Sequence, residues 1–281
     1  MDDATFMALM RVVPRSALST LVGRLVRAPA PAPLHHVAMR LFARAYDVDL
    51  GSAEADLSSY PTFAQFFTRK LKSGLRPIDP EPGSVVSPVD GTVSETGLVT
   101  NGRCLQAKGI DFPAGKLVGD EERARAFDGG AFATLYLAPR DYHRIHSPVA
   151  GKIVGSTYLP GEFWPVNPAS VRNVDALFAV NERLVTWVES TFGLVAVVAV
   201  GATCVARIHA TYDAITTHTG QPQETKVYPA PIPVEKGGEL GMFEMGSTVI
   251  LLFEKGRVAW EPFLTAGAKL RMGQRIGMAA K

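Results

Sequence analysis

The sequence predicts a mainly β protein with an α-helical N-terminal region, which places the chain in the α+β class. The 26 glycines and 20 prolines among 281 residues favour many turns, and from about residue 84 short β segments alternate with glycine and proline. Ahead of them, apolar residues recur at helical spacing over residues 1–46. We therefore divide the chain into a helical region, residues 1–60, and a β-rich domain, residues 61–281.

Three short helices are expected within residues 1–46, because Pro14 and the Ala-Pro alternation at 28–33 interrupt the helical pattern. A cationic amphipathic helix can lie in the headgroup plane of a lipid surface; the alternative is a helical cap on the protein's own core. No run reaches the ~18 apolar residues of a membrane-spanning helix, and Asp2 and Asp3 stand where an export signal would be positive. The basic residues of this region are all arginines: Arg11, Arg15, Arg24, Arg27, Arg40 and Arg44.

Charge and cysteine content exclude some classes of protein. A net charge of +2 is too small to argue for nucleic-acid binding. Cys104 and Cys204 are far apart and form no CxxC pair, which argues against a disulfide framework and against a zinc knuckle. We expect reduced thiols in a cytoplasmic protein, with Cys204 in the core.

Residues 62–71 predict a short helix after the N-terminal region. Thr62 is of the type that caps a helix N-terminus, and a phenylalanine-rich stretch follows it. We expect the aromatic side chains to face the core and Arg69 and Lys70 to be solvated.

A short motif occurs twice in the β-rich part, as Ser-Pro-Val-Asp-Gly at 87–91 and Ser-Pro-Val-Ala-Gly at 147–151. Proline, a glycine turn and a β-branched exit are typical of a strand, a tight turn and a second strand. Such units are similar to those of barrel-sandwich proteins, among them biotinyl and lipoyl carriers, sugar-phosphotransfer domains and zinc endopeptidases. We expect a barrel-sandwich-like β core built from repeated hairpin units, and this expectation does not settle function.

Asp90 occupies the turn of the first copy, where the second copy has Ala150. A turn aspartate most often bonds its own backbone; alternatively, Asp90 orients an imidazole that activates a nucleophile. The candidates for that imidazole are His143 and His146, which would share a face on a helix or 3₁₀ turn and point to opposite faces on a strand. An imidazole at its ordinary pKa of about 6.5 is poised to accept a proton near neutral pH.

Ser247 stands between a glycine-rich approach and an apolar run that suits a buried strand. One interpretation is a turn serine at the entry of a core strand. The other is that the Gly246-Ser247 bond reacts: the hydroxyl attacks the preceding carbonyl once a base removes its proton, and Gly246 tolerates the backbone angles that this needs. The resulting ester can eliminate and hydrolyse to a pyruvoyl group, a ketone cofactor made from the chain.

Two segments carry the closest likeness to a known family. Residues 136–146 match the signature Tyr-Leu-x-Pro-Arg-Asp-Tyr-His-Arg-x-His of phosphatidylserine decarboxylases almost residue for residue. Residues 245–248 are similar to the self-processing Leu-Gly-Ser-Thr of that family, with Met245 in place of Leu. The Phe-Phe-x-Arg stretch that ends at Arg69 and the Arg-Pro-Ile at 76–78 also look like family segments. The chain therefore resembles the family along nearly its whole length.

The resemblance implies both the reaction and the residues. In the family, the residues at Asp90, His146 and Ser247 form a triad for self-cleavage, and the residue at His143 is implicated in decarboxylation. Cleavage would give chains 1–246 and 247–281, which form a heterodimer that can dimerise further.

The implied cofactor is pyruvate, as a covalent pyruvoyl group derived from Ser247. It would form a Schiff base with phosphatidylserine, and loss of CO₂ would leave phosphatidylethanolamine, a step of phospholipid biosynthesis that needs no metal. A lipid substrate favours the membrane interpretation of residues 1–60, with the protein peripheral on the cytoplasmic side of the cell membrane.

Other segments give weaker expectations. Residues 158–167 and 177–183 look like family segments, whereas Ala206-Arg207 departs from the Gly-Ser that the family often has. Asn-Glu-Arg at 181–183 is typical of a hairpin turn, and residues 194–205 predict an apolar β pair about Gly201. His209 and His218 are expected to be surface or structural residues. The apolar residues that could wall a lipid-accepting pocket are Phe163, Trp164 and Phe178.

Two other functions compete with this interpretation. A zinc hydrolase could use His143, His146 and either His209 or His218 together with Asp90, but it would not explain the Gly-Ser-Thr strand entry, and the chain has no H-E-x-x-H. A carrier module would display a modifiable lysine at a hairpin tip, and none is evident; a phosphotransfer module would need only one histidine.

Overall fold

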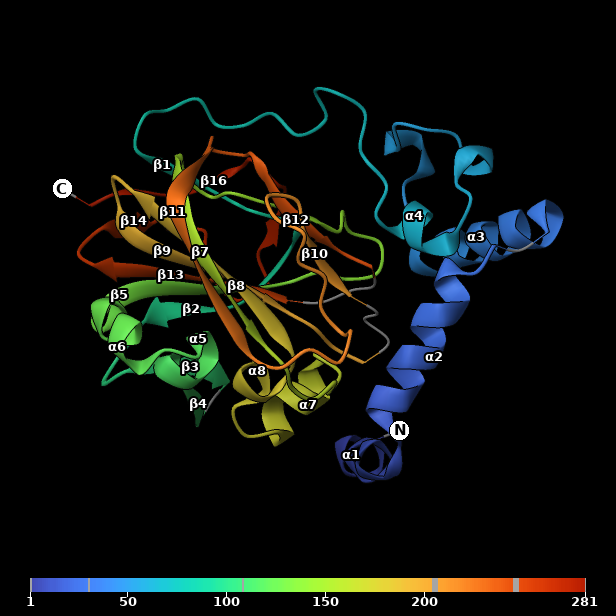
Figure 1. Ribbon diagram of the computed structural model, residues 1–281, viewed down its shortest axis with the longest axis horizontal. Helices are drawn as coiled ribbons and strands as arrows, with labels where there is room; N and C mark the ends of the chain where they lie inside the picture. The colour runs from blue at the N-terminus through green and yellow to red at the C-terminus, as the bar shows by residue number, and fades with distance from the viewer. Residues whose placement is uncertain (1, 30, 108, 204–206, 245–247, 281) are drawn as a thin grey trace.

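The computed structural model describes residues 2–29, 31–107, 109–203, 207–244 and 248–280. Figure 1 shows the helical N-terminal region beside a β-rich body, with the C-terminus on the far side of that body. One large apolar core fills the β-rich body, and a small second cluster around Met39 and Phe66 lies beneath the N-terminal helices. The predicted class, mainly β with a helical N-terminal region, is confirmed.

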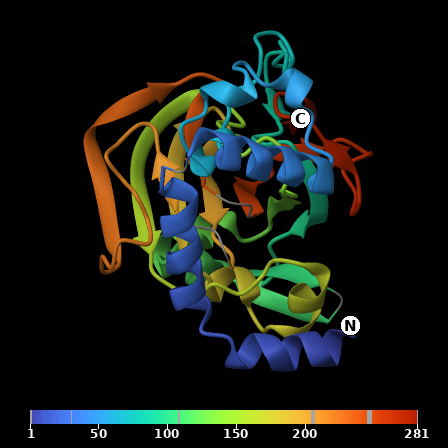
Figure 2. The same ribbon diagram turned by 90° about the vertical axis from the view of Figure 1, so that its right-hand side faces the viewer.

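The N-terminal region contains the three predicted helices, α1 (Asp3–Val12), α2 (Arg15–Arg27) and α3 (Ala32–Tyr46). The Asp2 side chain caps α1 by accepting a hydrogen bond of 2.7 Å from the Thr5 amide. Pro14 has no amide hydrogen to donate and separates α1 from α2. In Figure 2, α1 and α3 run across the view at the two ends of α2. None of the helices described is both long and apolar enough to span a membrane.

Helix α4 (Phe63–Phe67) begins as predicted, because the Thr62 hydroxyl accepts a hydrogen bond of 3.3 Å from the Gln65 amide. Phe66 and Phe67 are buried, as expected from the sequence, and Lys70 is exposed. The expectation that Arg69 is solvated is wrong. Arg69 is 3% exposed, its guanidinium lies 5.4 Å from the ring centre of Phe66, and it donates to the Arg140 carbonyl.

An antiparallel eight-stranded sheet forms the centre of the β-rich body, in the order β11-β7-β8-β9-β13-β5-β2-β15. Among the strands described, β11 and β15 are its open edges, so it is not a closed barrel. Its strands are β2 (Gly91–Leu98), β5 (Gly130–Tyr136), β7 (Gly151–Leu159), β8 (Arg183–Ser190), β9 (Gly193–Val200), β11 (Glu224–Val234), β13 (Thr248–Lys255) and β15 (Lys269–Leu270).

Smaller sheets and short helices complete the body. The smaller sheets are β1-β16-β14, β10-β12-β6 and β3-β4. Their strands are β1 (Ser84–Val86), β3 (Arg103–Ala107), β4 (Ile110–Pro113), β6 (Arg144–His146), β10 (Ile208–Ala210), β12 (Glu239–Phe243), β14 (Val258–Trp260) and β16 (Arg275–Ala279). The short helices are η1 (Leu50–Ser52), η2 (Leu57–Ser59), α5 (Ala114–Val118), α6 (Glu121–Ala124), η3 (Arg125–Phe127), α7 (Pro168–Asn173) and α8 (Leu177–Val180).

The two Ser-Pro-Val-x-Gly motifs have the same local structure. In each, the serine hydroxyl donates a hydrogen bond of 2.7 Å to the carbonyl two residues on, from Ser87 to Val89 and from Ser147 to Val149. The strand before each motif belongs to a small sheet and the strand after it to the eight-stranded sheet. Each motif therefore turns the chain from one sheet into another rather than closing a hairpin.

Two other expectations from the sequence need correction. Residues 181–183 are not a hairpin turn, because they join α8 to β8, and Asn181 uses its side-chain amide to bond the carbonyls of Trp164 and Gly201. Of the apolar run 194–205, the first part belongs to a single strand, β9, which ends at Val200. Residues 204 and 205, and with them the expectation for Cys204, lie outside the described residues. Cys104 is buried, and burial raises the pKa of its thiol to about 12.

The motif glycines provide a test of the fold. A Cβ at position 91 would stand 2.5 Å from the Tyr136 carbonyl oxygen, and one at position 151 would stand 2.3 Å from that of Glu189. Gly91→Ala and Gly151→Ala should each lower the free energy of unfolding by about 1–3 kcal/mol, because the backbone must shift. Chemical denaturation measures this loss. Gly97→Ala is the control, since its Cβ would meet only the Phe132 ring; an equal loss at all three positions would contradict the argument.

Candidate active site

The two repeated motifs bond to each other, and this pairing brings the Asp90 turn to His146. The His146 amide donates to the Pro88 carbonyl at 2.9 Å, and the Val86 amide donates to the Pro148 carbonyl at 3.0 Å. Residues that are about 60 positions apart in the sequence thus lie side by side. The sequence predicted both motifs but gave no sign that they pair.

The Asp90 carboxylate is fixed by two groups from distant parts of the chain. Its Oδ1 accepts hydrogen bonds of 2.8 Å from Arg76 Nε and from the Met272 amide, and its Oδ2 also contacts the Arg76 guanidinium. Asp90 is buried, so these bonds offset the cost of removing a carboxylate from water. The first interpretation of Asp90 was a turn aspartate that bonds its own backbone. Its carboxylate instead bonds Arg76 and the Met272 amide.

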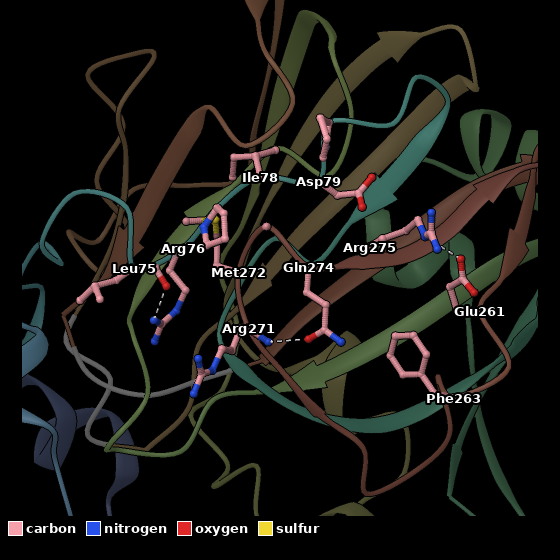
Figure 3. Close-up of a pocket in the computed structure, with 13 residues that line it drawn as sticks. Leu75, Arg76, Ile78, Asp79, Glu261, Phe263, Arg271, Met272, Gln274 and Arg275 are labelled. Carbon is pink, nitrogen blue, oxygen red and sulfur yellow. Dashed lines mark hydrogen bonds and ion pairs between the residues drawn. The ribbon is translucent and has the colours of Figure 1, made fainter.

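Arg76 and Met272 also line a cavity of about 570 Å³, shown in Figure 3 with Arg271, Gln274 and the ion pair of Arg275 with Glu261. Asp90, His143 and His146 do not belong to the lining described for this cavity. The connection of this cavity to Asp90 is therefore indirect, through Arg76 and Met272, which bond the Asp90 carboxylate.

His146 lies at the end of β6, and both ring nitrogens have partners. Nδ1 lies 2.8 Å from the Gly237 carbonyl oxygen, to which it must donate, and Nε2 lies 3.3 Å from the Tyr142 hydroxyl. Burial lowers the pKa of His146, although the Gly237 carbonyl and Glu239 oppose the shift. The ring is therefore neutral near pH 7, with the lone pair on Nε2.

His143 is fully buried and faces different neighbours from His146. Its Nδ1 lies 2.8 Å from the Asp141 carbonyl oxygen, and its ring centre lies 4.1 Å from that of Phe67 in α4. Burial, helped by the charge of Arg69, lowers the pKa of His143 to about 3. Its Nε2 has no hydrogen-bond partner among the residues described. A buried nitrogen in this state can accept a proton or a hydrogen bond from a group that enters the site.

The predicted cleavage pair, Gly246 and Ser247, lies outside the described residues, together with Met245. The residues on both sides of it are described. The Phe243 amide donates to the His143 carbonyl at 2.9 Å, and Thr248, which begins β13, pairs with Tyr136 of β5. Both flanks of the predicted cleavage bond are therefore attached to the segment that carries the histidines.

The structure thus brings together the segments that carry the predicted site residues. The repeated motifs place Asp90 near His146, which ends β6. His143 lies just before that strand, and its ring packs against Phe67 instead. No hydrogen bond joins Asp90 to His146 in the described part of the chain. The roles given to Asp90, His143, His146 and Ser247 stay predictions.

Sequence reasoning missed a group of charged residues beside the predicted cleavage bond. Glu244 is buried and bonds His209 Nε2 at 2.8 Å and the guanidinium of Arg27. His218 contacts the same helix, α2, at another residue: its Nε2 lies 2.9 Å from the Thr20 hydroxyl. The sequence assigns Arg27 only to a cationic helix face, because no motif marks a contact with a residue 217 positions away.

Two cavities share Tyr136 and Val166 in their lining, and one of them includes Thr248 at the start of β13. One, of about 390 Å³, is lined by Thr248, Tyr136 and Phe178 among others. The other, of about 260 Å³, lies between Tyr136 and the aromatic residues Phe42 and Phe67 of the helical region. Of the three residues predicted to wall a pocket, only Phe178 lines either cavity.

The zinc alternative finds no support in the donor set. Across the described ranges, no group of three or more histidine, cysteine, aspartate or glutamate side chains is placed to hold a metal ion. His209 and His218 instead bond Glu244 and Thr20.

Two neutral, buried imidazoles, one of them near a fixed carboxylate, are typical of an enzyme that moves protons. Comparison with known proteins identifies the family. Residues 63–278 match the family model described as phosphatidylserine decarboxylase. The chain therefore belongs to the phosphatidylserine decarboxylase family, whose members are carboxy-lyases.

Several relatives are similar to the chain over nearly its whole length. A phosphatidylserine decarboxylase proenzyme of Myxococcus xanthus is 61% identical over 278 residues, covering 99% of each chain. Proteins with the same name are 56% identical in Anaeromyxobacter, covering 100% of each chain, and 44% identical in Shewanella baltica, covering 97% of this chain and 96% of the relative.

Burial of His143 predicts how this ring titrates. Its NMR resonances should keep the positions of a neutral imidazole from pH 8 to about pH 5, because its pKa of about 3 lies below that range. The unfolded chain takes up this proton near the ordinary pKa of 6.5, so stability should fall as pH drops from about 6.5 towards 3. A ring that titrates with a midpoint near 6.5 would contradict the buried position.

Proposed function

We propose that the protein is a phosphatidylserine decarboxylase that is made as a proenzyme and cuts itself at Gly246-Ser247. The observation that carries the proposal is the similarity to named proenzymes over 99–100% of the chain, at identities up to 61%. The conversion of phosphatidylserine to phosphatidylethanolamine and CO₂ is the activity that we assign. The buried, neutral histidines beside the cleavage segment support it.

The proposed self-cleavage proceeds through an ester, an elimination and a hydrolysis. Ser247 Oγ attacks the Gly246 carbonyl carbon, the C–N bond breaks, and the hydroxyl proton passes to the freed amine, which leaves an ester. Loss of the Cα proton of residue 247 then expels the Gly246 carboxylate. The dehydroalanine that remains takes up water and releases ammonia, which gives the pyruvoyl group. Chain 1–246 ends in a carboxylate, and chain 247–281 begins with the ketone.

His146 is the base that we assign to the first step. Its Nδ1 donates to the Gly237 carbonyl, so the lone pair lies on Nε2, which can take the serine proton once it parts from the Tyr142 hydroxyl. Burial keeps the ring neutral at pH 7 and thus able to accept that proton. Asp90 lies in the motif that pairs with the His146 segment, and Arg76 holds its carboxylate. We assign to this carboxylate the negative charge that stabilises the protonated ring.

His143 is the residue that we assign to the decarboxylation. The pyruvoyl group would supply an electron sink for the carbanion that forms when CO₂ leaves. Because a carboxylate leaves as CO₂, the overall reaction consumes one proton. His143 Nε2 is buried and has no partner among the described residues, so we assign delivery of that proton to the substrate carbon to His143 or to a water that it holds.

The N-terminal helices form the surface that we assign to the membrane, on the cytoplasmic side of the cell membrane. Leu21 and Leu25 of α2 are 55% and 65% exposed, and Leu34, Val37 and Leu41 of α3 are also exposed. Exposed apolar side chains of this number, with arginines between them, suit a lipid surface. A cavity lined by Tyr46 of α3, Phe67 of α4 and Tyr136, which pairs with Thr248 of β13, could offer lipid an apolar route.

The two product chains should stay together as a heterodimer. Strand β13 belongs to chain 247–281, and it pairs along Thr248–Leu252 with both β5 and β9 of chain 1–246. Its side chains up to Phe253 are buried in the main core. Further association of these heterodimers with each other also belongs to the proposal.

The first experiment tests self-cleavage. Purified protein should show two chains, residues 1–246 and a second of 281 − 246 = 35 residues whose N-terminus is blocked. Ser247→Ala should give one uncut, inactive chain, because the nucleophile is gone, and Asp90→Asn or His146→Ala should slow or block cleavage. Intact mass spectrometry measures all of these. An active, uncut wild-type chain would refute the proposal, and normal maturation of His146→Ala would refute its role as the base.

The second experiment separates His143 from the cleavage step. His143→Ala should mature but should lose roughly 10²-fold or more of its decarboxylation rate, because the proton path to the substrate carbon is broken. Release of CO₂ from phosphatidylserine in mixed micelles measures the rate. His35→Ala, in the same assay, is the matched control, because it removes a buried imidazole from α3, outside the β-rich domain. Full activity of the matured His143→Ala chain would contradict the assignment.

The third experiment tests the membrane surface. Leu21→Ser combined with Leu25→Ser should weaken binding to vesicles of anionic phospholipid, because about 0.8 kcal/mol is lost for each buried CH₂ removed. Co-sedimentation at several salt concentrations measures the binding. Val227→Ser changes an exposed apolar residue on β11, away from the helices, and should leave binding unchanged. Equal binding by the double variant and the wild type would show that α2 does not contact lipid.

A further inference from the structure

Glu244 is held through both its side chain and its backbone amide. It stands two residues before Gly246, and its side chain is buried. Oε1 accepts a hydrogen bond of 2.8 Å from His209 Nε2, and Oε2 forms an ion pair with Arg27. The Glu244 amide also donates to the Arg207 carbonyl at 3.0 Å. Both the backbone and the side chain of this residue are therefore fixed.

Arg27 comes from outside the β-rich body. It is the last residue of α2, and the same helix contacts the body at two further places. Arg15 pairs with Glu162 at 2.7 Å and lies 3.6 Å above the Trp164 ring, and the Thr20 hydroxyl contacts His218. The position of α2, whose other face carries the exposed Leu21 and Leu25, thus determines where the Arg27 guanidinium lies.

The chain is fixed just as firmly after the cleavage bond. Thr248 is buried, and it pairs with Tyr136 on one side and Val200 on the other. Only residues 245–247 separate this anchor from Glu244. Three residues span at most about 10–14 Å, so the position of Glu244 limits the directions from which the Ser247 hydroxyl can approach the Gly246 carbonyl.

We propose that Glu244 is a positioning residue for self-cleavage and that Arg27 of α2 holds it in place. The inference rests on the proposed function, because it concerns the same bond. Glu244 takes no part in the bond changes; it fixes the upstream end of the reacting segment. The helix that we assign to the lipid surface is thereby joined by a direct side-chain contact to the site where the cofactor is made.

The charges around Glu244 agree with this role. Burial alone would raise the pKa of Glu244, but the hydrogen bonds from His209 and Arg27 outweigh burial, so its pKa is lowered. The groups that face it are Arg27 from α2 and His209 from β10, with the Arg207 backbone beside them. The carboxylate stays ionised at neutral pH, and the contact is lost only as pH falls through that lowered pKa.

The test follows maturation of the full chain made by cell-free translation, with fragments separated by electrophoresis over time. Glu244→Gln keeps the size of the side chain and removes its charge, and it should slow self-cleavage by about tenfold or more. Arg27→Met should slow it similarly. Arg27→Lys should recover part of the rate, because the cation is restored. The control is Glu235→Gln, which removes an exposed carboxylate from the chain ahead of β12 and should mature at the wild-type rate.

A double variant separates positioning from a general loss of stability. If Arg27 acts through Glu244, the combination of Arg27→Met with Glu244→Gln should be no slower than either change alone. Effects that multiply, or single variants that mature at the wild-type rate, would overturn the inference and leave the proposed function intact. A wild-type chain that stays uncut would instead overturn the proposed function, and this inference with it.

Discussion

The pairing of the two Ser-Pro-Val-x-Gly motifs is the constraint on which the site depends. Two backbone hydrogen bonds, from His146 to Pro88 and from Val86 to Pro148, hold two chain reversals against each other. Each reversal needs its glycine, because the partner strand lies too close for a side chain. The carboxylate of one motif and the imidazole ahead of the other are thus placed by backbone geometry before any side-chain interaction is considered.

Burial then sets the chemistry of the histidines. Both rings are buried, which disfavours their protonated form and leaves a lone pair available at neutral pH. The carbonyl groups of Asp141 and Gly237 each hold one ring nitrogen, so the free lone pair is on Nε2 in both. The two imidazoles, one just before β6 and one at its end, have different neighbours, which is compatible with the two separate steps that we propose for them.

Much of the fold could be predicted from the sequence because its signals are local. Proline positions gave the three N-terminal helices, the Thr62 cap gave the start of α4, and glycine with proline gave the β-rich body. The burial of Arg69 could not be predicted, since it depends on a carbonyl contributed by Arg140, 71 residues further on. No local signal indicated that the short helix α8 precedes Asn-Glu-Arg, where a strand and a hairpin turn were expected.

For the candidate site, the residues that stand in motifs could be predicted, but the contacts that hold them could not. Asp90, His143, His146 and Ser247 stand in recognisable motifs, so a chain read residue by residue can single them out. Arg76 and Tyr142 stand in recognised segments, but their contacts with Asp90 and His146 depend on how those segments fold. Glu244 bonds His209 and Arg27, which are 35 and 217 positions away in the sequence. Such contacts become visible when the strands are arranged, because no periodicity or motif encodes them.

The place of β13 in the middle of the sheet has a consequence for the lifetime of the enzyme. A strand with neighbours on both sides cannot leave without dismantling the core. If the chain is cut as we propose, the short fragment can be neither exchanged for a fresh copy nor supplied separately. A dissociable coenzyme can be replaced after damage, whereas the loss of the proposed ketone would inactivate the whole molecule.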